Sequence, residues 1–170
     1  MTEIIFVSGI HGVGKGVLCQ SLQKVFGYPV YSCSDLIKKY SEYIEIDKVV
    51  GNAERNQLSL LAGLRDINKE HIFLDGHFCL VGENEKIIEL SYETFDAIAP
   101  CKIVNVICDE NVVYQRLKSR DGVSLEVDIL KRLQTAEIER ARKYSESRKV
   151  PLICYESGSE MSKLIEWVAR

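Results

Sequence analysis

The expected fold follows from one stretch near the N-terminus, Ile4–Gly16, which reads IIFVSGIHGVGKG. Its first four residues form a continuous apolar run, which is typical of a strand buried on both faces of a parallel sheet. The glycines that follow permit backbone angles and close approaches that a side chain would forbid. Gly9, Gly14 and Lys15 have the spacing G-x-x-x-x-G-K of a phosphate-binding loop. A strand, a glycine loop and a helix start in this order predict a cradle of backbone N–H groups for the phosphates of a nucleotide, with ATP favoured.

Several residues of this loop are candidate ligands of the nucleotide. Lys15 is expected to supply a positive charge to the β- and γ-phosphates. His11 braces the loop, contacts a phosphate, or is a loop histidine without a catalytic task. A glycine-rich turn with a solvated lysine is the structural alternative for the whole motif. The expected nucleotide-binding residues of the loop are Gly9, His11, Gly12, Val13, Gly14, Lys15, Gly16 and Val17.

The composition is that of a globular protein, with 46% hydrophobic and 28% charged residues, and it excludes a disordered chain. A net charge of −3 provides no general attraction to nucleic acid or anionic lipid, so we expect neither nucleic acid nor a membrane as a partner. The six scattered cysteines include no Cys-x-x-Cys pair, which indicates buried thiols in a reducing compartment. The N-terminal apolar run is short and follows no basic segment, so we expect a cytoplasmic protein. Monomer and homodimer both stay open.

Short apolar runs alternate with helical patterns along the whole chain. The expected strands are Glu3–Ser8, Pro29–Ser32, His71–Asp75, Lys102–Cys108 and Val150–Tyr155. The first expected helix runs from the loop to about Phe26, with Gly27 as its cap, and the second begins near Ser34. Three more are expected over Asn52–Asn68, Asn111–Ser119 and Leu125–Arg148. The last is expected to begin at the capping-box pattern Ser157-Gly158-Ser159-Glu160. This alternation predicts a three-layer, doubly wound α/β fold with a five-stranded parallel sheet. Ligands of such sheets lie beyond the carboxyl ends of the strands, so functional residues are expected in the loops that follow them.

On these residues the chain resembles an adenylate kinase or, more broadly, a nucleoside monophosphate kinase of the P-loop fold. In this family a glycine follows the loop lysine, as in Lys15-Gly16. The few residues between Arg120 and Glu126 leave room for a minimal lid, as in the compact archaeal-type adenylate kinases. The resemblance extends over nearly the whole chain. Ser32–Lys38 resembles the monophosphate site of the family, and Phe73–Gly76 resembles the end of its third strand. Asp109-Glu110 with Arg116 and Arg120 resembles the approach to the lid, Arg140 resembles a phosphate-contacting arginine of the next helix, and Ser157-Gly158 resembles the loop beside the adenine.

The resemblance implies one P-loop kinase domain over residues 1–170, with an acceptor-binding helical region at 34–68 and a short lid at 116–126. It also implies ATP as the donor and Asp75 as a ligand that holds Mg²⁺ through water, because Mg²⁺ gives up its waters reluctantly. The structural alternatives are a turn cap for Asp75, a solvated helix face for the lid arginines and surface ion pairing for Arg140. The implied catalytic residues are Lys15, Arg116, Arg120 and Arg140, the adenine-side residue is Gly158, and the acceptor-binding candidates are Ser34, Asp35, Lys38, Arg55, Asp75 and His77.

Three departures from the family pattern affect the expected function. Val17 replaces a threonine and removes a hydroxyl near the phosphates, and Lys38 replaces a monophosphate-binding arginine. The stretch His77–Cys79 stands where the family has Phe-Pro-Arg, and Arg55 is a candidate to compensate. The leading hypothesis is a kinase that phosphorylates a nucleoside monophosphate. The alternatives are a kinase for a nucleoside, a sugar or a nucleic-acid end, and a slow ATPase or nucleotide-binding switch.

Overall fold

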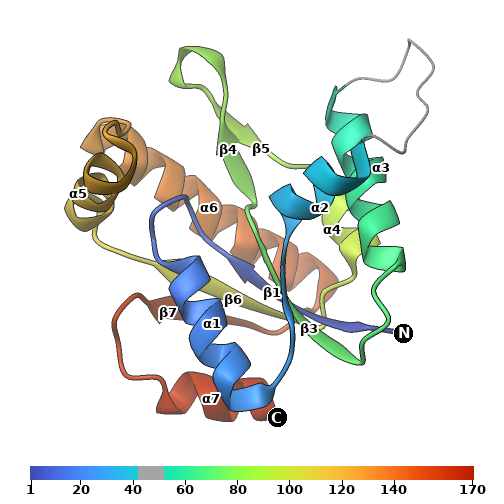
Figure 1. Cartoon of the computed structure of the whole chain (residues 1–170). Helices are drawn as coiled ribbons and strands as arrows, with labels where there is room; N and C mark the ends of the chain where they lie inside the picture. Colours follow the sequence, from blue (N-terminus) through green and yellow to red (C-terminus); the bar gives the residue numbers. More distant parts are fainter. Residues whose placement is uncertain (42–51) are drawn as a thin grey trace.

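A computed structural model of the chain describes residues 1–41 and 52–170. Its centre is a five-stranded sheet in the order β2-β3-β1-β6-β7, and every neighbouring pair of strands runs parallel (Figure 1). The expected doubly wound α/β fold is therefore confirmed. The strands are β1 (Glu3–Ser8), β2 (Val30–Ser32), β3 (His71–Gly76), β6 (Lys102–Ile107) and β7 (Leu152–Glu156).

Helices cover both faces of this sheet, which explains why its central strands are mostly apolar on both faces. Ile5 and Val7 of β1 point to one face, whereas Ile4 and Phe6 point to the other, because side chains alternate along a strand. The first face packs against α1 and α7, and the second against α2, α3 and α4 (Figure 1). The helices are α1 (Lys15–Phe26), α2 (Cys33–Tyr40), α3 (Asn52–Arg65), α4 (Tyr92–Ile98), α5 (Glu110–Asp121), α6 (Val127–Arg148) and α7 (Ser162–Ala169).

The long helix α6 contributes to both parts of the core. Leu130 and Leu133, in its first half, belong to the cluster on the α1 side, and Ala141 and Tyr144, in its second half, belong to the opposite cluster. At 1.5 Å of rise per residue, a helix of 22 residues is about 33 Å long. Residues in its two halves therefore face different parts of the molecule.

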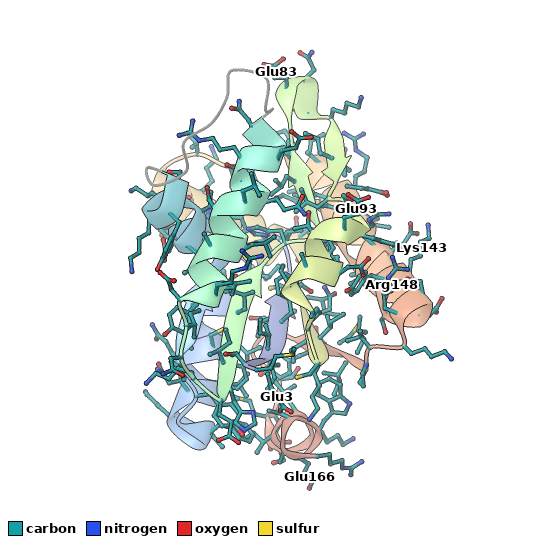
Figure 2. All side chains as sticks on the ribbon, turned by 90° about the vertical axis from the view of Figure 1, so that its right-hand side faces the viewer. Glu3, Glu83, Glu93, Lys143, Arg148 and Glu166 are labelled. Atoms are coloured by element: carbon teal, nitrogen blue, oxygen red, sulfur yellow. The ribbon has the colours of Figure 1, made fainter. Side chains whose placement is uncertain are left out.

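The region between β3 and β6 contains elements that the sequence pattern does not reveal. Strands β4 (Cys79–Val81) and β5 (Ile87–Glu89) pair antiparallel as a hairpin, and a short 3₁₀ helix (Glu83–Glu85) forms its turn. Figure 2 shows Glu83 of this turn and Glu166 of α7 at opposite ends of the molecule. Strands of three residues are too short to display an alternation that can be read from sequence.

The end of α1 and the start of α7 can be compared with the caps expected from the sequence. Gly27 adopts a left-handed φ of 72° after α1 and its N–H donates to Gln23 O, as expected. The expectation for the last helix is wrong, because α7 starts at Ser162 and not at Ser157. Gly158 has a φ of 85°, which interrupts a helix, and Ser157 N–H donates to Ile107 O at the end of β6.

The predicted lid and acceptor regions can be located on the helices of this fold. Helix α5 ends at Asp121, Gly122 caps it with a φ of 75°, and α6 begins at Val127, so residues 122–126 connect the two helices. The predicted acceptor region 34–68 comprises most of α2, the whole of α3 and residues 42–51, which lie outside the described residues. No helix in the described ranges has both the length and the apolar character needed to cross a membrane.

Candidate active site

The phosphate loop connects β1 to α1 at the carboxyl edge of the sheet. Gly14 caps α1 with a left-handed φ of 99°, and a Cβ there would lie 2.9 Å from Ser157 Oγ. A Cβ on Gly9 would lie 2.7 Å from Val106 O. Gly9 is therefore required by close approach to the backbone of β6, and Gly14 by its left-handed conformation and its approach to the Ser157 side chain. The first N–H groups of a helix have no partner within the helix, so those of α1 can bind a ligand at this end.

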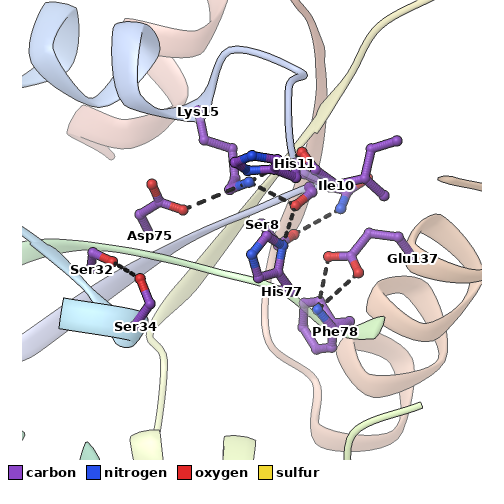
Figure 3. Close-up of polar contacts among 12 residues, drawn as sticks. Ser8, Ile10, His11, Lys15, Ser32, Ser34, Asp75, His77, Phe78 and Glu137 are labelled. Atoms are coloured by element: carbon purple, nitrogen blue, oxygen red, sulfur yellow. Dashed lines mark hydrogen bonds and ion pairs between the residues drawn. The ribbon is translucent and has the colours of Figure 1, made fainter. Parts of the chain in front are cut away.

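Lys15 extends from the first turn of α1 back across the loop (Figure 3). Its ammonium donates to Gly9 O at 2.9 Å and to Ile10 O at 3.2 Å, and it lies 3.8 Å from Asp75 Oδ1. The side chain is only 6% exposed. Burial lowers the pKa of Lys15, while the carboxylate of Asp75 opposes that shift. The loop thus holds a cation where the phosphates of a nucleotide would lie.

Asp75 lies near the end of β3, level with Val7 of β1 and Ser32 of β2. Its carboxyl group is partly exposed to the cleft, and burial raises its pKa while Lys15 lowers it. No group of three or more metal-binding side chains occurs in the described part of the chain. One carboxylate beside a phosphate site suits Mg²⁺, which keeps several waters and takes its remaining ligands from phosphates.

His77 links the segment after β3 to the phosphate loop. Its Nδ1 lies 2.7 Å from Gly9 O, and because a carbonyl can only accept, the proton of the neutral ring resides on Nδ1. Burial and the nearby Lys15 lower the pKa of His77 to about 4. The imidazole is therefore neutral at physiological pH, and Nε2 carries a lone pair that can accept a hydrogen bond.

Two arginines of α5 lie beside the loop. Arg116 Nη1 donates to Gly12 O at 3.4 Å and to Val13 O at 3.3 Å. Arg120 Nη2 lies 2.5 Å from His11 Nε2. The spacing of four residues along the helix places both guanidinium groups on the same face, directed at the loop.

These elements surround a cleft of about 1080 Å³. It is bounded by the phosphate loop, the starts of α1 and α2, the end of β3, the last turns of α5 and the loop after β7. The sequence-predicted residues that line it are His11, Gly12, Gly14, Lys15, Gly16, Val17, Ser34, Asp75, His77, Arg116, Arg120 and Gly158. The remaining two predicted residues of the loop, Gly9 and Val13, are buried and do not line the cleft.

Four other predicted residues, Arg140, Arg55, Asp35 and Lys38, are not among those that line the cleft. Arg140 Nη2 donates to Leu90 O at 2.7 Å, and its guanidinium lies 3.9 Å from the centre of the Tyr92 ring. Its place in the second half of α6 directs it to the segment after the hairpin, so it does not reach the phosphate loop. Arg55 donates to Ser41 O, and Asp35 and Lys38 are exposed on α2.

The cleft is also lined by residues that were not among the individual site residues expected from the sequence, although Ser32 belongs to the stretch Ser32–Lys38 compared with the monophosphate site. Ser32 Oγ lies 2.8 Å from Ser34 Oγ at the start of α2, and Ser119 and Tyr155 complete other parts of the wall. Beneath the wall, the buried carboxylate of Glu137 accepts hydrogen bonds from backbone N–H groups. Glu137 belongs to the charged stretch Glu137–Lys143, which in sequence resembles a solvated helix face.

The fold and the cleft define a nucleotide-binding P-loop protein with the architecture of P-loop kinases. Residues 8–146 match the AAA domain family, and the chain belongs to this family. An adenylate kinase from Wigglesworthia glossinidia brevipalpis is 25% identical over 129 residues, which cover 75% of this chain. The chain spans 61% of the length of that relative. The expected family-level resemblance to adenylate kinases is confirmed.

Solved structures with the same fold include several kinases. A gluconokinase from Sinorhizobium meliloti 1021 is 17% identical with a TM-score of 0.52, covering 97% of this chain and 87% of its own. A putative kinase from Chloroflexus aurantiacus is 14% identical with a TM-score of 0.57, covering 99% and 97%. A shikimate kinase from Bacteroides thetaiotaomicron is 19% identical with a TM-score of 0.54, covering 97% and 92%. At these identities the likeness establishes the fold.

Proposed function

We propose that this chain is a Mg²⁺-dependent phosphotransferase that moves the γ-phosphate of ATP to a small acceptor bound in the same cleft. The observation that carries the proposal is the meeting of Lys15 and Asp75, 3.8 Å apart, on a cleft that also receives Arg116 and Arg120. Phosphoryl transfer depends on alignment of the reactants and on neutralisation of charge, more than on covalent help from the protein.

The donor half of the cleft is formed by the phosphate loop and the two arginines of α5. Lys15 would exchange its bonds to loop carbonyls for bonds to the β- and γ-phosphates, and the N–H groups at the start of α1 would hold their oxygens. Arg116 and Arg120 already face the loop and would stabilise the charge that spreads over the transferred group.

Asp75 is the residue that would hold Mg²⁺, and the bound ion would supply neutralisation of the phosphate charge. Asp75 is partly exposed to the cleft at the end of a buried strand, so a hydrated ion between it and the phosphates fits the arrangement. Val17, at the position where the related family has threonine, lines the cleft without offering a hydroxyl ligand.

The acceptor half of the cleft is formed by Ser32–Ser34 and Asp75–His77. A nucleoside monophosphate is the first candidate acceptor, in line with the order of motifs along the chain and with the adenylate kinase among its relatives. Ser34 would then contact the monophosphate, and the acceptor phosphate would attack the γ-phosphate of ATP.

A specific observation favours a second class of acceptor, a neutral molecule with a hydroxyl group. Among the described residues, the acceptor half contains no lysine or arginine, because Arg140 is bound elsewhere and Lys38 and Arg55 do not line the cleft. A phosphate monoester placed there would face Asp75 without a cation of that half. A hydroxyl could instead donate to His77 Nε2 while its oxygen attacks the γ-phosphate, the bond to ADP breaks, and its proton leaves through the imidazole to water.

One experiment tests the function and separates the two acceptor classes. The purified chain is incubated with Mg-ATP and, in parallel, with nucleoside monophosphates and with nucleosides, sugars and polyols, and products are resolved by chromatography and ³¹P NMR. Lys15→Ala serves as the control. A nucleoside diphosphate formed in step with ADP supports the first class, and a new phosphomonoester supports the second. ADP release at one slow rate with every acceptor would contradict the kinase function and favour an ATPase or a switch.

A further inference from the structure

Glu137 is a buried carboxylate in the middle of α6, 1% exposed, that contacts the active-site segment from below. Its Oε1 and Oε2 accept from Phe78 N–H at 2.8 Å and 2.9 Å (Figure 3). Its Oε2 also accepts from Cys79 N–H at 2.6 Å. These two residues directly follow His77, so Glu137 holds the backbone that carries an acceptor-half residue.

The segment that Glu137 holds is bonded in turn to the phosphate loop. Gly9 O accepts from His77 and from Lys15, and the Lys15 ammonium lies 3.8 Å from Asp75 Oδ1. The positive charge of Lys15 is also one of the causes that lower the pKa of Glu137. Glu137 thus supports the backbone next to a group of side chains that meet at Gly9.

We propose that Glu137 is a positioning residue of the phosphotransfer site, which keeps His77 and Asp75 in place against the phosphate loop by holding the backbone of Phe78 and Cys79. This inference rests on the proposed function for its consequence on turnover. Its structural content, the dependence of His77 placement on Glu137, stands independently of any acceptor.

A comparison within α6 argues that the charge at this position serves the site. Gln134, one turn earlier and also buried, contacts both backbone groups of Cys108, with Nε2 donating to its O at 2.8 Å and Oε1 accepting from its N–H at 3.0 Å. A neutral amide suffices there because one donor and one acceptor are needed. Both backbone partners of Glu137 are N–H donors, so the NH₂ group of a glutamine at this position would oppose a donor instead of an acceptor.

The carboxylate is costly to bury at this position. Burial raises the pKa of Glu137 to about 7, while the N–H groups of Phe78 and Cys79 and the charge of Lys15 lower it. Among the described residues Glu137 has no ion-pair partner within 4.0 Å, so hydrogen bonds from loop backbone are its main compensation. A buried charge whose compensation comes from the loops of a cleft restrains those loops strongly.

The test compares Glu137→Gln with the wild type through the backbone amides of Phe78 and Cys79, observed in ¹H–¹⁵N NMR spectra of the labelled protein. In the wild type both amide protons are expected to exchange slowly with solvent, because both N–H groups donate to the buried carboxylate. In Glu137→Gln the amide NH₂ group opposes an N–H donor, so the signals of both amides are expected to move upfield and their exchange to become about tenfold faster.

A matched control separates positioning from loss of stability. Leu133→Ala removes a buried side chain from the same helix, in the core cluster on the α1 side, and is expected to lower the melting temperature without moving the amide signals of Phe78 and Cys79. Glu137→Asp keeps the charge but shortens its reach, and an intermediate shift of these signals is expected. This variant also decides the question if Glu137→Gln fails to fold. Amide signals of Phe78 and Cys79 that are unchanged in the folded Glu137 variants would overturn the inference.

Kinetics supply the second readout. The kcat of Glu137→Gln is expected to fall about 10²-fold, as for a reacting group displaced by about 1 Å, while KM for ATP changes less than about threefold. Shifted amide signals of Phe78 and Cys79 with unchanged kcat would also overturn the positioning role. If the wild type transfers phosphate to no acceptor, the proposed function fails, and the inference is judged on these amide signals alone.

Discussion

The two halves of the cleft differ in how their charges are provided. In the donor half, Lys15 lies within the motif that also forms the cradle, and Arg116 and Arg120 face it from a single helix. In the acceptor half, the described residues offer Ser32, Ser34, Asp75 and the neutral His77, and no lysine or arginine lines that wall.

In the proposed reaction, this difference separates the part of the site that would recognise phosphate from the part that would select the second substrate. The donor half needs only a local motif, because backbone N–H groups and one lysine recognise any nucleoside triphosphate. The acceptor half is assembled from the starts and ends of three elements, so its chemistry changes with single substitutions such as His77 or Cys79 in place of the related family's Phe and Arg. The following predictions test that contrast.

The largest effect is expected for Lys15→Ala. Transfer should fall on the order of 10⁴-fold, because the phosphates lose the cation that neutralises them. The fold should persist, since α1 keeps its glycine cap and the buried ammonium is itself costly. Transfer rates and far-ultraviolet circular dichroism measure the two outcomes. Undiminished transfer, or an unfolded variant, would count against the assignment of the donor half.

The next effect compares two arginines that the sequence treats alike. Arg120→Ala should lower the transfer rate about 10³-fold, because Arg120 faces the loop. Arg140→Ala should leave the rate within about threefold of the wild type. It should instead lower stability by about 1–2 kcal/mol, through loss of its bonds to Leu90 O and its contact with Tyr92. Equal rate losses in both variants would show that Arg140 reaches the transferred group.

The third prediction concerns the neutral histidine of the acceptor half. The pKa of His77 falls from 6.5 to about 4 on folding, so the unfolded chain binds more protons between these values. The contribution of His77 to stability is complete above pH 6.5 and is lost as the pH falls toward 4, by about 3 kcal/mol. Denaturant unfolding at pH 7 and pH 4 should therefore show a larger acid loss in the wild type than in His77→Gln. Equal losses would contradict the buried, neutral state.

The smallest effect is expected from restoring a hydroxyl to the donor half. Val17 is 72% exposed and lines the cleft, so Val17→Thr can be introduced without disturbing the core. A hydrogen bond from the new hydroxyl should tighten binding of Mg-ATP about fivefold. Calorimetric titration with and without Mg²⁺ measures it. An equal gain for ATP without Mg²⁺ would place the hydroxyl away from the metal.

The fold was largely predictable because its signals are local. Buried parallel strands are continuous apolar runs, and the positions of five such runs agree with the observed strands within two residues at each end. The hairpin β4–β5 and helix α4 were not predicted, because three-residue strands have no readable period. The start of α7 was misplaced because Ser157 bonds to Ile107 at the end of β6 instead of capping a helix.

The sequence by itself determined the phosphate loop and its lysine, because strand, glycines and helix start are contiguous and each acts through its own backbone. Only the tertiary structure decided which further side chains meet them. His77 and Gly9 are 68 residues apart, and Glu137 and Phe78 are 59 residues apart, so no local pattern links them. Arg140 and Glu137 lie within one turn of α6, yet one is held outside the cleft by Leu90 and Tyr92 and the other supports the cleft from below. The direction of a side chain on a helix depends on what packs against that face, which is settled by the assembled sheet and not by the residue's own neighbours in sequence.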